Sequence, residues 1–305
     1  MTQTPSRRRF LGLLSMLPLS GLVPRAAFAQ RVMPTRRIPV TGESLPVVGL
    51  GSSKVVQEIA ENGEEPLRQV LRTLVAHGGK VVDTWPRNAE NDGRFGTVIN
   101  EPEFRDRLFV TTKLDQMGKD AGIAQFRQAQ KLYGRKVIDL VQIFSLTDLE
   151  THWPSLRGWK EAGEARYIGV TVSDARMYDQ LERFLQRERP DFMQVNYSIT
   201  ERQSEERMLP LAADRGIAVL VNRPFMNGAY FQRLEGTPLP AWAAEFGATT
   251  WAQFSLKYIL ANQLLTGVLT ETSNPKHMAE NAEAAFGPMP DEAARRRMRE
   301  FIDTV

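Results

Sequence analysis

The sequence predicts a (β/α)₈ barrel. Short apolar runs recur along the chain at intervals of about thirty residues, and they begin near Val47, Lys80, Leu108, Val137, Ala165, Asp191, Ile217 and Gly267. Amphipathic stretches lie between these runs, and strand–helix alternation repeated eight times over about 250 residues is the pattern of this barrel. A doubly wound sheet is the alternative fold, but G-L-G-S-S at 49–53 lacks the spacing of a dinucleotide-binding glycine turn.

The predicted elements follow in order, with the barrel itself at residues 37–288. Residues 31–46, with turn residues at 41–43, predict a β-hairpin that closes the bottom of the barrel. Residues 66–78 predict a helix between a Pro and a Gly, with apolar residues at helical spacing, namely Leu67, Val70, Leu71, Leu74 and Val75. Residues 291–302 predict one further helix, and we interpret its arginine run as a solvated face.

The first 29 residues predict an export signal. S-R-R-R-F-L-G at 6–12 resembles a twin-arginine signal, and an apolar run from Phe10 to Val23 and the pattern Ala27-Phe28-Ala29 follow it. The apolar run is shorter than the roughly 20 residues that span a bilayer. We therefore expect cleavage after Ala29, a barrel domain at residues 30–305, and a mature protein in the periplasm or otherwise exported, without stable membrane insertion.

Charge and residue usage exclude several kinds of site. The whole chain carries a net charge of +3, but removal of residues 1–29 takes away four arginines and no acid, which leaves 35 basic and 36 acidic residues. This balance gives no argument for a nucleic-acid partner. The chain has no Cys, and His77, His152 and His277 are too far apart in sequence for a local metal motif, so we predict no metal site.

Two predicted strands end in a charged residue. V-V-D at 81–83 closes with Asp83, and L-F-V-T-T-K at 108–113 closes with Lys113. Because the carboxyl ends of barrel strands form the active-site face, we expect these two side chains to approach within roughly 4 Å. One interpretation is catalysis or ligand binding. The other is a purely structural ion pair, since deleting one partner of a buried pair costs roughly 3–5 kcal/mol.

Seven short motifs follow one another after residue 36. They are R-I-P-V-T-G-E-S-L-P-V-V-G-L-G at 37–51, V-V-D-T at 81–84, F-V-T-T-K-L at 109–114, I-D-L-V-Q-I at 138–143, R-Y-I-G-V-T at 166–171, M-Q-V-N-Y-S at 193–198 and S-N-P-K-H-M-A-E-N at 273–281. In this order and spacing, they resemble the aldo-keto reductase family over nearly all of the chain after residue 36. The resemblance implies a barrel that binds a nicotinamide cofactor along its mouth and reduces carbonyls.

The resemblance also implies a catalytic set of Asp, Tyr, Lys and His, of which this chain keeps half. Asp83 and Lys113 stand at the Asp and Lys positions, whereas Asn88 stands at the Tyr position and Phe144 at the His position. Carbonyl reduction needs an acid that protonates oxygen, and neither an amide nor a phenyl ring releases a proton near neutral pH. Lys113 therefore becomes the expected central polar group, with Asp83 as its orienting anion.

Other residues are candidates for the missing chemistry. Tyr197, just after the sixth strand, and His152, in the helix after the fourth strand, are alternative proton donors. Arg87, in the loop after Asp83, either binds an acidic substrate group or is a solvated loop charge.

The nicotinamide end of the implied cofactor site is partly retained. Gln194 stands where the family holds the nicotinamide amide, and Thr171 with Val172 stands where a Ser-Asn pair has the same role. Thr keeps the hydroxyl donor of Ser, whereas Val does not replace Asn. Asn222 stands where many members stack an aromatic ring on the nicotinamide, and Arg223 beside it is a candidate phosphate ligand or a surface salt-bridge residue.

The loop after the eighth strand implies the other end of an NAD(P)(H) site, where backbone N–H groups hold the phosphates. Four residues match the family there, namely Thr272, Ser273, Glu280 and Asn281. However, Glu271 stands where a Lys is often found, and His277 stands where an Arg is. An acidic residue repels a 2′-phosphate, so we expect NAD to be favoured over NADP, with Lys276 as the one cation nearby that opposes this expectation.

The sequence thus predicts an exported oxidoreductase of aldo-keto reductase type that acts on a carbonyl or alcohol, with the twin-arginine export machinery as its partner in transit. The alternative is a catalytically silent barrel that binds a small molecule or nucleotide in the same mouth. A retained cofactor loop without acid chemistry fits both functions, and fold alone does not decide between them.

Overall fold

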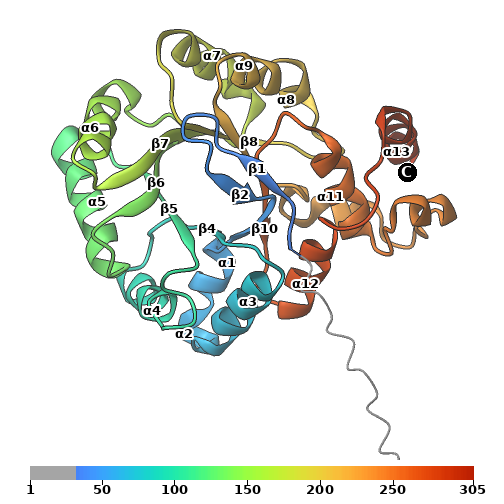
Figure 1. Ribbon diagram of the computed structural model, residues 1–305, viewed down its shortest axis with the longest axis horizontal. Helices are drawn as coiled ribbons and strands as arrows, with labels where there is room; N and C mark the ends of the chain where they lie inside the picture. Colours follow the sequence, from blue (N-terminus) through green and yellow to red (C-terminus); the bar gives the residue numbers. More distant parts are fainter. Residues whose placement is uncertain (1–31) are drawn as a thin grey trace, which may run out of the picture. The chain divides into compact units, whose positions relative to one another are not determined.

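In the computed structural model, which describes residues 32–305, parallel strands form a closed barrel surrounded by helices (Figure 1). The strand order around the barrel is β10-β3-β4-β5-β6-β7-β8-β9, and β9 pairs with β10 to close it. The strands are β3 (Val48–Gly51), β4 (Val81–Asp83), β5 (Phe109–Leu114), β6 (Ile138–Phe144), β7 (Ala165–Thr171), β8 (Phe192–Asn196), β9 (Ala218–Asn222) and β10 (Gly267–Glu271). The predicted fold is confirmed, while the predicted export signal lies outside the described residues.

Helices connect successive strands on the outside of the barrel. They are α1 (Ser53–Gln57), α2 (Ile59–Asn62), α3 (Glu65–Ala76), α4 (Ala89–Ile99), α5 (Lys119–Leu132), α6 (Leu149–Glu161), α7 (Tyr178–Arg187), α8 (Gln203–Glu206), α9 (Met208–Asp214), α10 (Ala229–Arg233), α11 (Trp251–Ala261), α12 (Pro275–Glu283) and α13 (Glu292–Thr304), with 3₁₀ turns η1 (Ala175–Met177), η2 (Met226–Gly228) and η3 (Ala241–Phe246). The helix predicted at 66–78 is α3, which buries the predicted apolar stripe. Within residues 32–305, no helix has the length and apolar character needed to span a bilayer.

The predicted N-terminal hairpin closes one end of the barrel (Figure 1). Its strands β1 (Thr35–Arg37) and β2 (Ser44–Pro46) pair antiparallel. Ile38 and Leu45 of this hairpin are buried in the same apolar cluster as the innermost strand residues, which are Val81, Phe109, Leu140, Tyr167, Phe192, Ala218, Leu220 and Leu269. The hairpin therefore seals the barrel interior from below and leaves the carboxyl ends of the strands as the open end.

Strand alternation decides which residues face that open end. On β6, Leu140 belongs to the inner apolar cluster, whereas Val141 and Ile143 belong to the cluster between barrel and helices. Because successive side chains point to opposite faces, Phe144 points inward like Leu140 and lies above it. The same alternation directs Asp83 and Lys113 inward above the apolar layer. Asp83 is the last residue of β4, and Lys113 is the last but one of β5.

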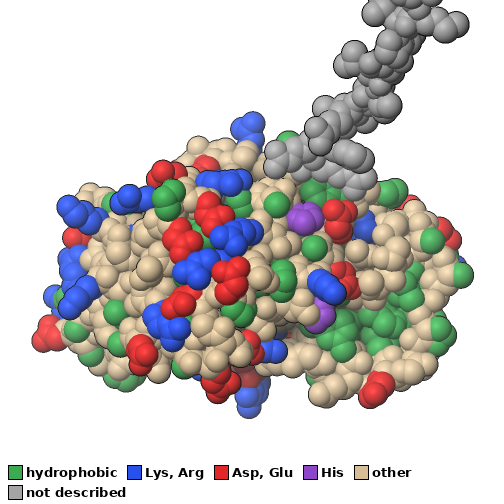
Figure 2. Space-filling model, turned by 90° about the horizontal axis from the view of Figure 1, so that it is seen from below, with side chains coloured by type: hydrophobic (Ala, Val, Ile, Leu, Met, Phe, Trp, Pro, Cys, Tyr) green, Lys and Arg blue, Asp and Glu red, His purple; other side chains and the backbone are tan. Residues whose placement is uncertain are grey.

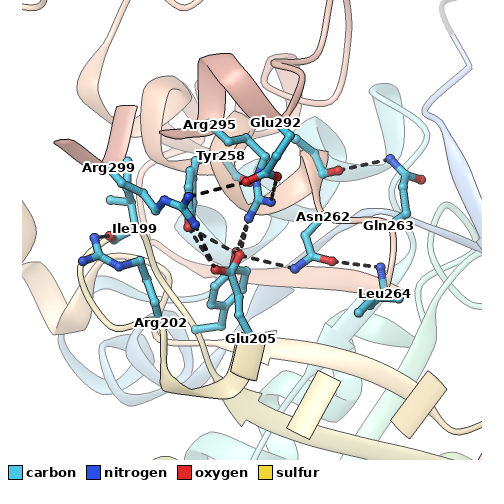
Figure 3. A network of polar contacts seen from close by, with 12 residues as sticks. Ile199, Arg202, Glu205, Tyr258, Asn262, Gln263, Leu264, Glu292, Arg295 and Arg299 are labelled. Carbon is cyan, nitrogen blue, oxygen red and sulfur yellow. Dashed lines mark hydrogen bonds and ion pairs between the residues drawn. The ribbon is translucent and has the colours of Figure 1, made fainter. Parts of the chain in front are cut away.

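The C-terminal helix α13 confirms the helix predicted at 291–302, but the interpretation of its arginine run as solvated is wrong for Arg295. Arg295 is 9% exposed, and its guanidinium pairs with the Glu205 carboxylate, which also accepts a hydrogen bond from the Tyr258 hydroxyl at 3.2 Å (Figure 3). Arg295 shares the buried helix face of Met298 and Ile302, because residues three and seven apart lie on one side of a helix. This network attaches α13 to α8 and α11.

On the side that carries α2, α3 and α4, acidic and basic side chains are interleaved over the surface (Figure 2). Arg72 pairs with Glu103 at 2.7 Å, and Arg68 pairs with Glu101 at 2.8 Å. This face consequently presents no continuous area of one charge sign.

Candidate active site at the barrel mouth

The carboxyl ends of the strands enclose a cavity of about 380 Å³. Eight of the residues singled out from the sequence line it together, namely Asp83, Lys113, Phe144, Thr171, Gln194, Asn222, Arg223 and Glu271. A more open depression of about 710 Å³ lies outside the barrel beside α6 and α7, and none of the predicted site residues lines it. The closed barrel therefore brings the predicted residues of seven strands and one loop to a single cavity.

At the floor of this cavity lies the predicted ion pair. Lys113 Nζ is 2.6 Å from Asp83 Oδ2, and the two residues are 5% and 7% exposed. The Thr111 hydroxyl donates to Asp83 Oδ1, and Gln194 Nε2 lies 3.3 Å from Asp83 Oδ2. Lys113 also donates to the Thr84 carbonyl at 3.2 Å, so two of its three N–H donors are used. The third is free for a group bound in the cavity.

Two amide side chains that line the cavity leave buried acceptor atoms without a partner. The Oε1 atom of Gln194 and the Oδ1 atom of Asn222 have no hydrogen-bond partner among the described residues. The amide nitrogens of both residues are engaged, that of Asn222 with the Val172 carbonyl at 3.2 Å. Since buried polar atoms are normally satisfied, these acceptors indicate that the cavity takes a ligand, or water, that carries N–H or O–H donors.

Arg223 follows β9 and adopts a strained backbone. Its φ of 52° lies in the left-handed region, which is uncommon for residues other than Gly and is found most often at functional sites. The guanidinium donates to the Ser173 carbonyl at 2.6 Å, and its buried Nε has no partner among the described residues. Arg223 thus offers a donor to a ligand beside the cavity.

An aromatic wall that sequence reasoning missed lies beside the ion pair. The ring centres of Trp85 and Phe144 are 4.0 Å apart, and both residues line the cavity. The Trp85 indole N–H donates to Asp115 Oδ2 at 2.9 Å, which fixes the ring orientation. The guanidinium of Arg87 lies over the Trp85 ring at 3.5 Å from its centre. Its position, two residues after the strand-ending Asp83, was the sequence signal that could have placed Trp85 at the mouth.

Asn88, at the family's Tyr position, does not line the cavity. Its side-chain oxygen accepts hydrogen bonds from the backbone N–H groups of Glu90 at 3.0 Å and Asn91 at 3.1 Å, so it caps the start of α4. The Asp92 carboxylate accepts from the backbone N–H groups of Arg87 at 3.0 Å and Asn88 at 3.1 Å. The loop that carries Trp85 is therefore held by the first turn of α4.

The two alternative proton donors suggested by the sequence are wrong. Tyr197 is fully buried, its hydroxyl bonds to Glu205, and Arg295 donates to that hydroxyl at 2.9 Å. Burial raises the pKa of Tyr197 well above its usual range. His152 is fully buried at α6, where its Nε2 lies 2.6 Å from the Gln116 carbonyl. Neither side chain lines the cavity, because Tyr197 is engaged by the Glu205 network and His152 lies on α6, outside the strands.

A second cavity, of about 240 Å³, adjoins the start of α12. Three of the four residues predicted for the far end of the cofactor line it, namely Thr272, Glu280 and Asn281, whereas Ser273 lines neither cavity. Glu271 lines both cavities, and its Oε1 accepts a hydrogen bond from the Lys54 backbone N–H at 2.9 Å. Across residues 32–305, no group of three or more acidic or histidine side chains is placed to hold a metal ion.

Known proteins share both sequence and architecture with this chain. A model of the aldo/keto reductase family matches residues 47–299. The NADH-specific methylglyoxal reductase of Escherichia coli (strain K12) is 33% identical over 232 residues, which are 63% of this chain and 68% of that protein. Two solved structures share the barrel architecture at low identity. The aldo-keto reductase AKR11C1 from Bacillus halodurans, in its holo form, has a TM-score of 0.69 and 20% identity, over 88% of this chain and 96% of that one. An aldo/keto reductase from Klebsiella pneumoniae in complex with NADP and acetate has a TM-score of 0.71 and 18% identity, over 89% and 96%.

Proposed function

This chain belongs to the aldo/keto reductase family, and on that premise we propose that it is an exported NAD(P)-linked oxidoreductase that reduces a carbonyl with a non-standard active site. The observation that carries the proposal is the Asp83–Lys113 pair, joined at 2.6 Å on the floor of the cavity. Its position at the strand ends, where barrel enzymes place their chemistry, favours catalysis over a purely structural pair.

Lys113 is the residue that handles the proton. A nicotinamide cofactor, when bound, supplies the hydride that adds to the carbonyl carbon. The free N–H of Lys113 donates to the carbonyl oxygen as negative charge develops there, and then passes its proton to that oxygen to complete the alcohol. Asp83 orients the ammonium and balances its charge, while Thr111 and Gln194 hold the carboxylate in place.

The residues present fit a nicotinamide cofactor. The unpartnered Oε1 of Gln194 can accept a hydrogen bond from the amide N–H of the nicotinamide carboxamide. The unpartnered Nε–H of Arg223 can donate to a phosphate oxygen. Glu271 at the border of the two cavities disfavours an additional 2′-phosphate. The NADH specificity named for the Escherichia coli relative agrees with our proposal that NAD is preferred.

A silent barrel that binds a small molecule is the second candidate, and a specific observation favours it. Among the described residues that line the mouth cavity there is no Tyr and no His. Trp85 and Phe144 instead form an apolar wall beside Lys113. A site of this kind binds a ligand well and protonates it slowly.

Calorimetry and kinetics on the protein purified after native export test the proposal. We expect weak NADH binding, no tighter NADPH binding, and slow turnover of simple aldehydes, since a lost general acid removes roughly 10²–10⁴-fold of rate. Lys113→Met is expected to abolish that turnover but retain NADH binding, whereas Lys131→Met, on an exposed position of α5, is expected to change neither. Failure of both nucleotides to bind at millimolar concentration favours the silent barrel, and turnover that survives Lys113→Met contradicts the assigned role.

Restoring the family residues is a complementary test. Asn88→Tyr with Phe144→His is expected to raise the basal rate, and Trp85→Ala is expected to add to the gain because the Trp85 ring packs 4.0 Å from residue 144. Asn88→Tyr removes the helix cap of α4 and is expected to cost about 1 kcal/mol of stability. A triple variant that folds and binds NADH but gains no rate would contradict the proposed cause of slow turnover.

A further inference from the structure

We propose that one buried water, bound by the hydroxyls of Thr84, Thr112 and Tyr133 on the outer side of the barrel wall, positions the Lys113 ammonium. Tyr133 then acts on the site as a positioning residue, although it does not line the mouth cavity. The part of Lys113 in reduction rests on the proposed function, whereas the water site does not.

Two of the hydroxyls lie directly behind the ion pair. Thr84 follows Asp83 in the chain, and Thr112 precedes Lys113. Because successive side chains of a strand point to opposite faces, Thr112 points away from the cavity into which Lys113 points. The two threonines are 1% and 0% exposed, and neither lines the cavity. Each member of the ion pair therefore has a neighbour in sequence that places a hydroxyl in the wall behind it.

Tyr133, the residue after α5, brings the third hydroxyl to this place. The side chain is fully buried, and its ring packs edge-on against Phe95 of α4, with the ring centres 5.4 Å apart and the planes at 80°. The hydroxyl is a close neighbour of the Thr84 and Thr112 hydroxyls. Burial, and after it the charge of Asp92, raises the pKa of Tyr133 above its usual range, so the phenol stays protonated and remains a donor.

The three hydroxyls are neighbours, but they do not satisfy one another. Among residues 32–305, none of the three oxygens has a well-formed hydrogen bond to a protein group. Buried polar atoms are normally satisfied, and a buried water typically makes about three hydrogen bonds to groups that otherwise lack a partner. Because the three hydroxyls carry no charge, they suit a neutral water better than an ion.

The water acts on Lys113 through Thr84. The Thr84 carbonyl accepts a hydrogen bond from Lys113 Nζ at 3.2 Å, whereas the Thr84 side chain faces the water. Strand β4 ends at Asp83, so the ladder of the sheet does not fix the direction of this carbonyl. A side chain anchored by the water holds it towards the ammonium. With Asp83 and Thr84 both in place, the third N–H of Lys113 is directed to the cavity.

A crystal structure of the protein at about 1.5 Å resolution tests the water site directly. We expect one water at about 3 Å from each of the three oxygens. Direct hydrogen bonds between the hydroxyls, with no water among them, would overturn the proposal.

Urea unfolding of two single variants and their double variant tests the site in solution. Tyr133→Phe keeps the ring, and Thr112→Val keeps the shape of the side chain. Each is expected to lower the folding equilibrium constant about fivefold. The double variant is expected to lose less than the product of the two, because the shared water is lost only once. Variants that are as stable as the native protein, or more stable, would show that the hydroxyls are dry and would contradict the site.

Competitive acetylation, read by peptide mass spectrometry, tests the effect on Lys113 without relying on turnover. The exposed Lys119 is the internal reference. In Tyr133→Phe, Lys113 is expected to react several-fold faster relative to Lys119, because a weaker hold by the Thr84 carbonyl favours the amine over the ammonium. Tyr258→Phe is the matched control. It removes a buried hydroxyl that donates to Glu205 at 3.2 Å, and it is expected to lower stability but leave the labelling of Lys113 unchanged.

Aldehyde turnover with NADH separates this proposal from the proposed function. In Tyr133→Phe we expect kcat to fall several-fold while KM stays the same, because the change acts on the proton donor and not on the cavity. Labelling of Lys113 that does not change in Tyr133→Phe would overturn the positioning role even if the water is found. Faster labelling in a protein that turns over no aldehyde removes the oxidoreductase and leaves the positioning of Lys113.

Discussion

Asp92→Asn is expected to make the stability of this protein less dependent on pH. Asp92 is 2% exposed, and its carboxylate has only two backbone N–H donors, from Arg87 and Asn88, to replace its hydration. Burial raises the pKa of Asp92 from its usual 3.8 to about 6, because the loss of water outweighs these two hydrogen bonds. The substitution keeps an acceptor oxygen at this position and removes the charge.

The sign of the pH effect follows from the two states of Asp92. The folded-state pKa lies above that of the unfolded chain, so the folded protein holds a proton that the unfolded chain has released between about pH 4 and pH 6. The stability that this proton contributes is fully present below the unfolded pKa and is lost as the pH rises through the folded pKa. With values of 3.8 and about 6, linkage gives about 1.4 kcal/mol between pH 5 and pH 8, and about 3 kcal/mol in full.

Urea unfolding at pH 5, 6, 7 and 8 measures this contribution. The free energy of unfolding of Asp92→Asn, relative to the native protein, is expected to rise by about 1.4 kcal/mol from pH 5 to pH 8. Asp179→Asn is the matched control, because Asp179 is 71% exposed on α7, and its profile is expected to run parallel to that of the native protein. A relative stability of Asp92→Asn that stays constant from pH 5 to pH 8 would refute the reasoning from burial.

Three further outcomes are expected. Glu205→Gln should lower the free energy of unfolding in urea by up to about 3 kcal/mol, because it removes the charge that faces the buried Arg295, and a loss no greater than for an exposed acid would contradict this. Arg7→Lys with Arg8→Lys should retain the precursor in the cytoplasm, and unchanged periplasmic accumulation after cell fractionation would refute the twin-arginine assignment. Glu271→Lys should raise NADPH affinity about tenfold in calorimetry with little effect on NADH, since it places a cation where an anion borders both cavities.

The strands were predictable because buried parallel strands are continuous apolar runs bounded by polar residues. The run expected near Val47 begins at Val48, and the run expected near Lys80 begins at Val81. The short helices α1 and α2, and the irregular segment from η2 to η3, did not follow from periodicity. The helices α1 and α2, and each helical piece within that segment, are shorter than the two turns over which a 3.6-residue repeat becomes visible.

Site residues were predictable where the end of a strand decides which way the side chain points. They were missed where the conformation of a loop decides it. Asp83 and Lys113 were found because a charge that closes an apolar run emerges at the mouth. Tyr197 was misassigned because it lies one residue beyond β8 and its side chain points outward to the Glu205 network. Asn88 carried a readable signal, since an Asn followed by an acidic first turn is typical of a helix cap.

The departures from the family's catalytic set are concentrated in one loop and the strand end beside it. The loop after β4 carries Trp85, Arg87 and Asn88, and Asp92 anchors it from α4. Strands supply the rigid frame, and loops carry many of the residues that contact ligands. A changed loop therefore alters which ligand the cavity binds without disturbing the Asp83–Lys113 pair. Because the Asn88 side chain caps α4, a single Tyr at that position also removes the cap that holds the loop. Exchange of residues 84–88 as a block therefore tests the origin of the altered site more directly than any single substitution in it.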